Sequence, residues 1–445
     1  MSDTADAAVA GAADTEVGSY FVANYPPFSV WTSEAVEDIA RPTLAADPAD
    51  VPLGLYLHIP FCRKRCHFCY FRVYTDKNAS EVQAYIDTLA KEWELYGHQP
   101  AIADRPLDFI YFGGGTPSFL SVRQLQGLVD RLTAVRSWST ASEITFECEP
   151  GTLTEAKLRA IRNMGVTRLS LGIEHFDDTV LELNGRAHRS LEIFRAYEFA
   201  RTIGFPQINI DLIAGMLGDT NEKWNNAIEQ TLALEPDSVT IYQMELPFNT
   251  TISSDLIKKT GQFTDTVASW STKRRWVDEA FEALERAGYT IGSAYTAVKD
   301  PAKTTFVYRD RLWQGADLAG LGVASFGHIN GVHMQNLDSW GPYAAAVEAG
   351  NIPLNRAYRP TDEERLIREL VLQLKRGSIH PGYFKNKYHV DVQSRFEGPF
   401  ASLNNDGYLS ELSADMVQLS REGLLRVDSL LPRFFLPVHT EIRYT

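Results

Sequence analysis

The sequence predicts an α/β protein: a partial (β/α)6 barrel followed by a small C-terminal α+β domain of winged-helix-like pattern. Two observations predict the barrel. Strand-like and helix-like segments alternate with short connections between residues 53 and 246, which is typical of parallel strands with helices outside. Polar residues also recur at the ends of these strands, where the loops of such folds build an active site.

The predicted strands are apolar or alternating and lie at residues 53–61, 107–115, 142–150, 166–176, 208–216 and 238–246. The predicted helices repeat apolar residues every three or four positions and lie at residues 79–97, 121–135, 154–165, 190–204 and 221–236. Ser80 and Ser121 are candidate N-caps, and Gly165 follows the end of its helix. Because six units are fewer than a closed eight-fold barrel needs, we expect an open barrel.

The remaining residues suggest four regions. Residues 1–17 are small and acidic, and we expect them to be disordered. Residues 18–52 are expected to extend over the active site. The barrel and its extension are placed at 53–355, and the helical, winged-helix-like domain at 356–445. The aromatic segment FFLPVHTEIRYT at the C-terminus would either cap a planar substrate or pack on the barrel.

Composition limits the possible classes of function. Of 445 residues, 44% are hydrophobic and 22% charged, which is ordinary for a soluble globular protein. The net charge of −14 argues against nucleic acid and anionic lipid as partners. No segment has the ~20 apolar residues of a membrane-spanning helix, and the N-terminus does not resemble a signal peptide. With only four cysteines, we expect a cytoplasmic protein without a disulfide framework. We also expect a monomer.

Three of the cysteines, Cys62, Cys66 and Cys69, fall within eight positions in the spacing C-x3-C-x2-C. A structural zinc site usually has four ligands, and His67 is too close to Cys66 to bind the same ion easily. A [4Fe–4S] cluster with three cysteine ligands has one open iron, which could bind the amino and carboxylate groups of S-adenosylmethionine (SAM). The basic run 63–65 favours thiolates. Zinc and an accidental group of buried cysteines are the alternatives.

The segment YLHIPFCRKRCHFCYF around these cysteines resembles the signature of radical SAM enzymes related to oxygen-independent coproporphyrinogen III oxidase. Further segments follow in the order of that family, namely YFGGGTP, ECEP, RLSLGIEHF, NGR, NIDLIAGM and GLGVASFG. The resemblance covers most of residues 50–440. It implies a radical SAM barrel that holds a [4Fe–4S] cluster through the three cysteines and binds two SAM molecules.

By position, the resemblance implies that the first SAM would be surrounded by Tyr56, Gly114, Glu147, Glu245 and Phe326. The second SAM would be surrounded by Phe68, Gly115, Thr116, Glu174, Arg186 and Asp211.

Some of these residues also carry a physical expectation of their own. The glycines at residues 113–115 have no side chain, so their backbone can approach a ligand closely. Asp211, at the end of an apolar strand, is costly to bury unless it is paired or bound. Arg186 matches an arginine that pairs with a SAM carboxylate. We expect Glu174 and Tyr56 to be catalytic, with Glu174 either pairing with the sulfonium of the second SAM or taking a proton.

The sequence departs from the family pattern at three places. Glu174 stands where glutamine is usual, and Glu245 stands where a small residue is usual. The oxidase continues its cluster motif with a C-x-C-N run, whereas this chain reads Cys69-Tyr70-Phe71-Arg72. We therefore expect an enzyme other than a standard haem-pathway oxidase.

Three functions follow as hypotheses. The preferred one is a class C radical SAM methyltransferase that uses the second SAM to methylate or cyclopropanate an sp² carbon of a natural product. The second is oxidative decarboxylation of coproporphyrinogen III, with Arg309, Arg311 and Arg72 as candidates to hold its carboxylates. The third is a haem chaperone, with iron ligands among His58, His175, His328 and His333. For the enzymes, the resemblance implies a small-molecule substrate and a flavodoxin or ferredoxin as electron donor.

Overall fold

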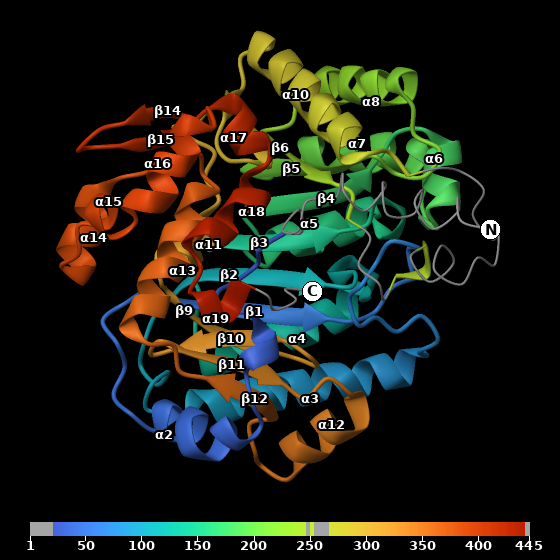
Figure 1. Ribbon diagram of the computed structural model, residues 1–445. Coiled ribbons are helices and arrows are strands. Elements are labelled where there is room, and N and C mark those ends of the chain that lie inside the picture. Colours follow the sequence, from blue (N-terminus) through green and yellow to red (C-terminus); the bar gives the residue numbers. More distant parts are fainter. Residues whose placement is uncertain (1–20, 246–249, 253–266, 441–445) are drawn as a thin grey trace, which may run out of the picture.

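The computed structural model describes residues 21–245, 250–252 and 267–440, so the predicted disorder of residues 1–17 lies outside the described residues (Figure 1). A twelve-stranded sheet forms the centre, in the order β12-β11-β10-β9-β1-β2-β3-β4-β5-β6-β8-β7. Its first six strands are β1 (Leu53–Ile59), β2 (Leu107–Gly114), β3 (Glu143–Cys148), β4 (Arg168–Glu174), β5 (Gln207–Ala214) and β6 (Ser238–Gln243). The other six are β7 (Thr290–Ile291), β8 (Thr296–Val298), β9 (Asp317–Leu321), β10 (Phe326–Ile329), β11 (Val332–Asn336) and β12 (Leu354–Tyr358).

The predicted partial barrel is confirmed, and its sheet contains more strands than the six predicted. Strands β1 to β6 pair in parallel in chain order, and β9 adds a further parallel strand beside β1. The antiparallel strands β10 to β12 and β7 to β8 extend the two edges. The Gly-rich region after residue 304 therefore belongs to the same sheet, which the six-unit pattern did not predict.

Helices between the strands pack on the sheet, as Figure 1 shows. They are α3 (Ala79–Gly97), α4 (Val122–Val135), α5 (Glu155–Asn163), α6 (Asp178–Leu183), α7 (Ser190–Ile203) and α8 (Asn221–Leu234), followed by α10 (Trp270–Arg286), α11 (Val307–Trp313) and α12 (Trp340–Glu348). On α3, for example, Leu89 and Trp93 are completely buried in the main core. None of the described helices could span a membrane.

The ends of these helices test the predicted caps. Ser121 caps α4 and completes a capping box with Gln124, as predicted. The cap of α3 is Asn78 rather than Ser80, because the Asn78 side chain accepts from the backbone of Ser80 and Glu81. The prediction was therefore wrong by two residues. Gly165 follows α5 with φ +91°, as a terminating glycine should.

The C-terminal residues form a small α+β layer with its own hydrophobic core, drawn in orange and red in Figure 1. Its helices are α13 (Asp362–Leu374), α14 (Pro381–Tyr388), α15 (Val392–Arg395), α16 (Glu397–Asn405), α17 (Arg421–Leu425), α18 (Val427–Leu430) and α19 (Pro437–Thr440). The strands β13 (Ser378–Ile379), β15 (Val417–Leu419) and β14 (Leu409–Leu412) form a three-stranded sheet in that order. Val22 and Tyr25 pack into the same core, which fixes the N-terminal segment across this domain.

Candidate functional site

The cysteine loop follows β1 and is closed at its base by backbone hydrogen bonds. Cys62 donates to the Tyr74 carbonyl at 3.1 Å, and Tyr74 donates to the Pro60 carbonyl at 2.7 Å. The far part of the loop is held by His67, whose Nδ1 lies 2.9 Å from the Leu183 carbonyl after α6. The loop therefore bridges β1 and the α6 region.

The three cysteines are partly exposed on this loop. The Thr116 hydroxyl lies 3.3 Å from Cys62 Sγ, and Arg186 Nη1 lies 3.2 Å from Cys66 Sγ. Burial, together with the neighbouring Cys66, raises the pKa of the Cys62 thiol to about 12 and that of the Cys69 thiol to about 11. Binding a cluster would have to displace these protons.

The donor set fits a [4Fe–4S] cluster. In the part of the chain that the structure describes, no three His, Cys, Asp or Glu side chains surround one point closely enough to hold a single metal ion. Each thiolate of a cluster binds a different iron, so three thiols on one loop suit a cluster better than one zinc ion. Two polar atoms beside the loop, Arg186 Nε and His58 Nε2, are buried without a hydrogen-bond partner. They point to a further polar ligand at this place.

The glycines at the end of β2 pack against the end of β1. Gly115 donates to the Ile59 carbonyl at 2.9 Å, and a Cβ on Gly115 would lie 2.9 Å from that oxygen. Gly114 has φ +111°, and its Cβ would lie 2.7 Å from the His58 ring. Glycine is therefore required at these two positions because their backbone packs closely against β1, not because of contact with a ligand. This packing places Thr116 beside Cys62.

Glu147 and Asp211 lie on the inner side of the neighbouring strands. The Tyr111 hydroxyl donates to Glu147 at 2.6 Å, and Tyr56 stacks on Tyr111 with ring centroids 6.0 Å apart. Burial, helped by the charge of Asp211, raises the pKa of Glu147 to about 7. Asp211 accepts from Ser170 at 2.8 Å and from Asn209 at 2.8 Å, so this half-buried carboxylate is hydrogen-bonded on both oxygens.

Glu174 lies close to Arg186 at the end of β4. Its backbone has φ +66°, an unfavourable conformation for a residue with a side chain. Its carboxylate lies 3.5 Å from Arg186 Nη2. Burial raises the pKa of Glu174 to about 7, although the Arg186 charge opposes this shift. The structure thus brings Glu174, Arg186 and Cys66 together.

Arg168 is a central residue that the sequence reasoning missed. It opens β4, is completely buried, and places its guanidinium 4.1 Å from the centre of the Phe306 ring. Its positive charge lowers the pKa values of Glu147 and Asp211, although burial raises them overall. The available signal was an arginine at the start of the apolar strand RLSLGIE.

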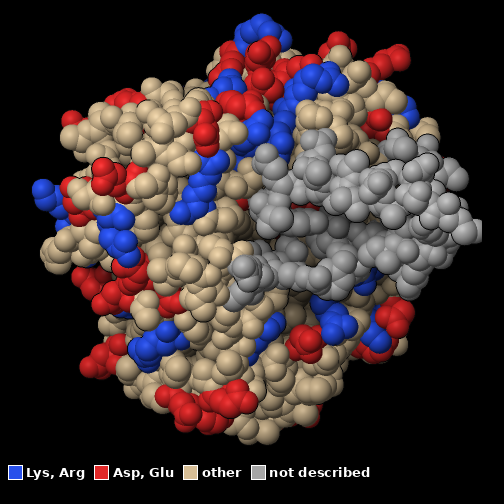
Figure 2. Space-filling model, viewed as in Figure 1, with Lys and Arg blue, Asp and Glu red and all other residues tan. Residues whose placement is uncertain are grey.

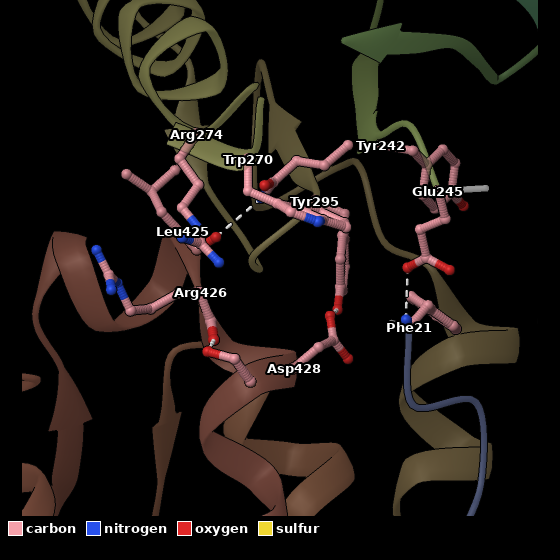
Figure 3. A pocket seen from close by; sticks show the side chains of 11 residues that line it. Phe21, Tyr242, Glu245, Trp270, Arg274, Tyr295, Leu425, Arg426 and Asp428 are labelled. Atoms are coloured by element: carbon pink, nitrogen blue, oxygen red, sulfur yellow. Dashed lines mark hydrogen bonds between the residues drawn. The ribbon is translucent and has the colours of Figure 1, made fainter. Parts of the chain in front are cut away.

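Three of the predicted SAM-binding residues make contacts outside the group of Glu147, Glu174 and Arg186. Phe68 packs in a satellite core with Met216 and Met244. Phe326 is 42% exposed, and its ring centre lies 5.6 Å from that of Trp31. Glu245 accepts a hydrogen bond from the backbone of Phe21, which Figure 3 shows.

The residues in Figure 3 line a small cavity of about 40 Å³ between β6, α10 and the C-terminal domain. Arg274 and Arg426 lie on one side of it, and Tyr242 and Glu245 on the other. Burial and the charge of Asp428 raise the pKa of Glu245 to about 8. Tyr242 is 41% exposed although β6 is an inner strand, so its ring faces open space beside the site.

The arginines proposed to hold substrate carboxylates lie mostly elsewhere. Arg311 pairs with Asp108 at 2.8 Å, near the start of β2 and therefore at the end of the barrel opposite the cysteines. This prediction was wrong, because a basic residue close in sequence to a Gly-rich motif need not face the same end of the strand. Arg309 pairs with its neighbour Asp310, and Arg72 lies 3.8 Å from Asp338. Figure 2 shows acidic and basic side chains intermixed over the viewed face.

Comparisons with known proteins agree with this geometry. The model of the radical SAM superfamily matches residues 56–231. The oxygen-independent coproporphyrinogen III oxidase of Salmonella typhimurium is 30% identical and aligns over 78% of this chain and 77% of its own. The heme chaperone HemW of Bacillus subtilis is 28% identical over 83% of this chain and 96% of its own. The solved structure of coproporphyrinogen III oxidase from Escherichia coli, 24% identical, shares the fold with a TM-score of 0.81 over 93% of this chain and 96% of that one.

Proposed function

The chain belongs to the oxygen-independent coproporphyrinogen III oxidase family of radical SAM enzymes, and from this premise we propose that it oxidatively decarboxylates the propionate side chains of coproporphyrinogen III or a close analogue. The observation that carries the proposal is the arrangement at one end of the barrel. There the three-thiol loop lies beside Arg186 and the inward-facing carboxylates Glu147, Glu174 and Asp211.

The expectation of a class C methyltransferase or cyclopropanase was wrong. The curated relatives are named coproporphyrinogen III oxidases or heme chaperone. That expectation rested on the two implied SAM sites and on the run Cys69-Tyr70-Phe71-Arg72, whereas the similarity to the oxidase of Salmonella typhimurium extends over 78% of the chain.

Cys62, Cys66 and Cys69 would hold the cluster, and Arg186 and Thr116 would lie beside it. Bound there, a [4Fe–4S] cluster would supply the electron that cleaves SAM and yields a 5′-deoxyadenosyl radical. We infer that Arg186 binds a SAM carboxylate, because its Nε is buried and has no partner among the described residues. Two SAM sites, as assigned from the sequence, are part of this proposal.

The carboxylates of the site would orient SAM by charge. A pKa near 7 leaves Glu147 and Glu174 partly protonated at neutral pH, and a nearby sulfonium or ammonium would favour their ionised forms. Tyr56 has a pKa far above its usual value because it is buried, so it acts as a neutral hydrogen-bonding group rather than as a base. Its hydroxyl lies 3.2 Å from His58 Nδ1.

The proposed reaction converts a propionate into a vinyl group. The carbon β to the carboxyl loses a hydrogen atom, and the side chain then loses CO₂ and gives one electron to an acceptor. Substrate carboxylates need cations, and we infer that Arg274 and Arg426 supply them, because both line the cavity next to Tyr242. They take the role that the sequence reasoning gave to Arg309 and Arg311.

Haem transfer is the second candidate, because a heme chaperone matches over 96% of its length. The four histidines considered for it, His58, His175, His328 and His333, each bury more than nine-tenths of their surface, so none presents an exposed imidazole to a haem. This favours the oxidase.

The test is anaerobic turnover of the reconstituted protein with SAM, a reductant, an electron acceptor and coproporphyrinogen III, read by mass spectrometry. The proposal predicts a product that has lost CO₂ and two hydrogen atoms for each side chain converted, with Cys66→Ala inactive. Formation of 5′-deoxyadenosine with an unchanged porphyrinogen would count against the substrate. A Soret band on haem addition, without turnover, would favour the chaperone.

A further inference from the structure

A cavity of about 550 Å³ lies at the end of the barrel opposite the cysteine loop, where β1 and β9 meet α13 and α14. Val51 precedes β1 and Asp317 opens β9, and the two strands are parallel, so both lie where the strands begin. The cysteines follow the other end of β1, which is roughly 20 Å long. The proposed catalytic function gives this cavity no role.

Arg368 on α13 lines this cavity and is 6% exposed. Its Nε donates to Asn24 at 2.6 Å and its Nη1 to the Leu312 carbonyl at 3.3 Å. Within the described residues no carboxylate lies within the 4.0 Å of an ion pair with it. The charge of Glu369 acts on Arg368, but this carboxylate contacts Lys387 instead. A buried guanidinium without a directly contacting anion is costly, which indicates that a bound anion completes the site.

Three of the four acidic residues that line the cavity already have partners; the fourth, Asp47, forms no ion pair within the described residues. Asp317 pairs with Arg105 at 2.7 Å, and Glu369 pairs with Lys387 at 2.7 Å. Asp362 pairs with Arg365 at the rim. These pairs leave Arg368 as a buried cation of the wall whose charge is not matched by a contact within the described part of the chain.

A neighbouring histidine adds a hydrogen-bond acceptor. His333 Nε2 lies 3.3 Å from the Tyr25 carbonyl and must therefore carry a hydrogen. His333 Nδ1 then accepts, and His328 Nδ1, 2.9 Å away, is its donor. Burial and the charge of Arg368 keep the pKa values of both rings well below the usual range, so both rings are neutral. His328 Nε2 consequently bears a lone pair, and His328 lines the cavity.

We propose that this cavity binds a small anionic molecule through Arg368, with Arg365 at the rim, and that a hydroxyl or amino hydrogen of the same molecule bonds to His328 Nε2. The anionic group is a carboxylate or a phosphate, since a guanidinium pairs with either in the same geometry. A volume of about 550 Å³ is in the range of small-molecule sites.

The test is isothermal titration calorimetry of the full chain with citrate and, separately, with inorganic phosphate, at constant ionic strength in chloride. One saturable site is expected for at least one probe, and the tighter probe identifies the anionic group. Arg368→Met should weaken binding by roughly 30-fold or more, because it removes one partner of a buried charge contact. Arg365→Gln should weaken binding several-fold.

The matched control is Arg376→Gln, whose guanidinium lies outside the cavity and is about as exposed as that of Arg365, 40% against 41%. It should bind like the parent protein. Absence of saturable binding of both probes would overturn the proposal, as would binding that Arg365→Gln and Arg368→Met leave unchanged. If Arg368→Met does not fold, the binding affinity of Arg365→Gln tests the proposal, because the Arg365 side chain is exposed and can change without disturbing the core.

Discussion

Arg63 and Glu149 form an ion pair with two hydrogen bonds, 2.9 Å from Nε to Oε2 and 2.6 Å from Nη2 to Oε1. The pair ties the cysteine loop to the end of β3. His188 Nδ1 lies 3.3 Å from the same carboxylate, and the Glu149 backbone donates to Ser118. The loop that carries the cysteines is therefore positioned by charge as well as by its backbone.

Arg63→Ala should reduce the iron that the protein retains after anaerobic reconstitution and desalting. Losing a two-bonded contact that is partly exposed should cost about 1–2 kcal/mol of loop stability. Iron and sulfide analysis measures the effect, and Lys64→Ala, a change on the exposed side of the same loop, is the control. Equal iron content in both variants would show that the pair does not position the loop.

Glu149 should make stability depend on acidic pH. Burial alone would raise its pKa, but His188 and Arg63 together lower it to about 2, below the unfolded value near 4.5. The stabilisation, up to about 3 kcal/mol, is therefore complete above pH 4.5 and is lost as the pH falls toward 2. The melting-temperature difference between the parent protein and Glu149→Gln should shrink over that window. A difference that does not vary with pH would refute this assignment.

Glu92 should be a stability determinant far from the chemistry. This buried carboxylate on α3 accepts from Tyr343 at 2.6 Å, from Asn336 at 2.6 Å and from the Gly322 backbone at 2.8 Å. Glu92→Ala removes the acceptor of the Tyr343 hydroxyl and of the Gly322 N–H, whereas Asn336 keeps the Gly322 carbonyl and Ser325 as acceptors. The substitution should cost about 3 kcal/mol.

Thermal unfolding checks this prediction against Glu94→Ala, which removes an exposed ion pair with Arg131 and should cost less than about 1 kcal/mol. Similar losses for the two variants would mean that the Glu92 network contributes little to stability.

Arg186→Lys should separate SAM binding from cluster binding. Lysine keeps the charge but loses the planar fork and the Nε donor, so the affinity for SAM should fall about tenfold or more. The iron content should stay close to that of the parent protein, because the cysteines are unchanged. Equilibrium binding of SAM to the reconstituted variant measures the effect, and an unaltered affinity would exclude Arg186 as the carboxylate partner.

Local patterns predicted the strands of the barrel, because period and turn chemistry are encoded within each segment, whereas the SAM-binding residues were assigned from the family resemblance. The pairing of strands that are far apart in the sequence could not be predicted from such local patterns. Strand β9 joins β1 across more than 250 residues, and Arg105 finds Asp317 only through that pairing.

The direction in which a side chain points was the second feature that the sequence did not predict. Arg168 was given no role from the sequence, yet it is completely buried against the Phe306 ring. Arg311 was a candidate to hold substrate carboxylates, yet it lies at the end of the barrel opposite the cysteines. The reaction was misjudged because the two implied SAM sites and the three residues after the cluster motif were given more weight than the similarity of the whole chain.

The most direct measurement is the fate of one hydrogen. The reconstituted protein is incubated without oxygen with SAM, a reductant, an electron acceptor and coproporphyrinogen III deuterated at the propionate carbon β to the carboxyl. Mass spectrometry should find deuterium in 5′-deoxyadenosine together with a decarboxylated porphyrinogen. Deoxyadenosine free of deuterium, formed while the porphyrinogen keeps all its carboxyl groups, would contradict the proposed function.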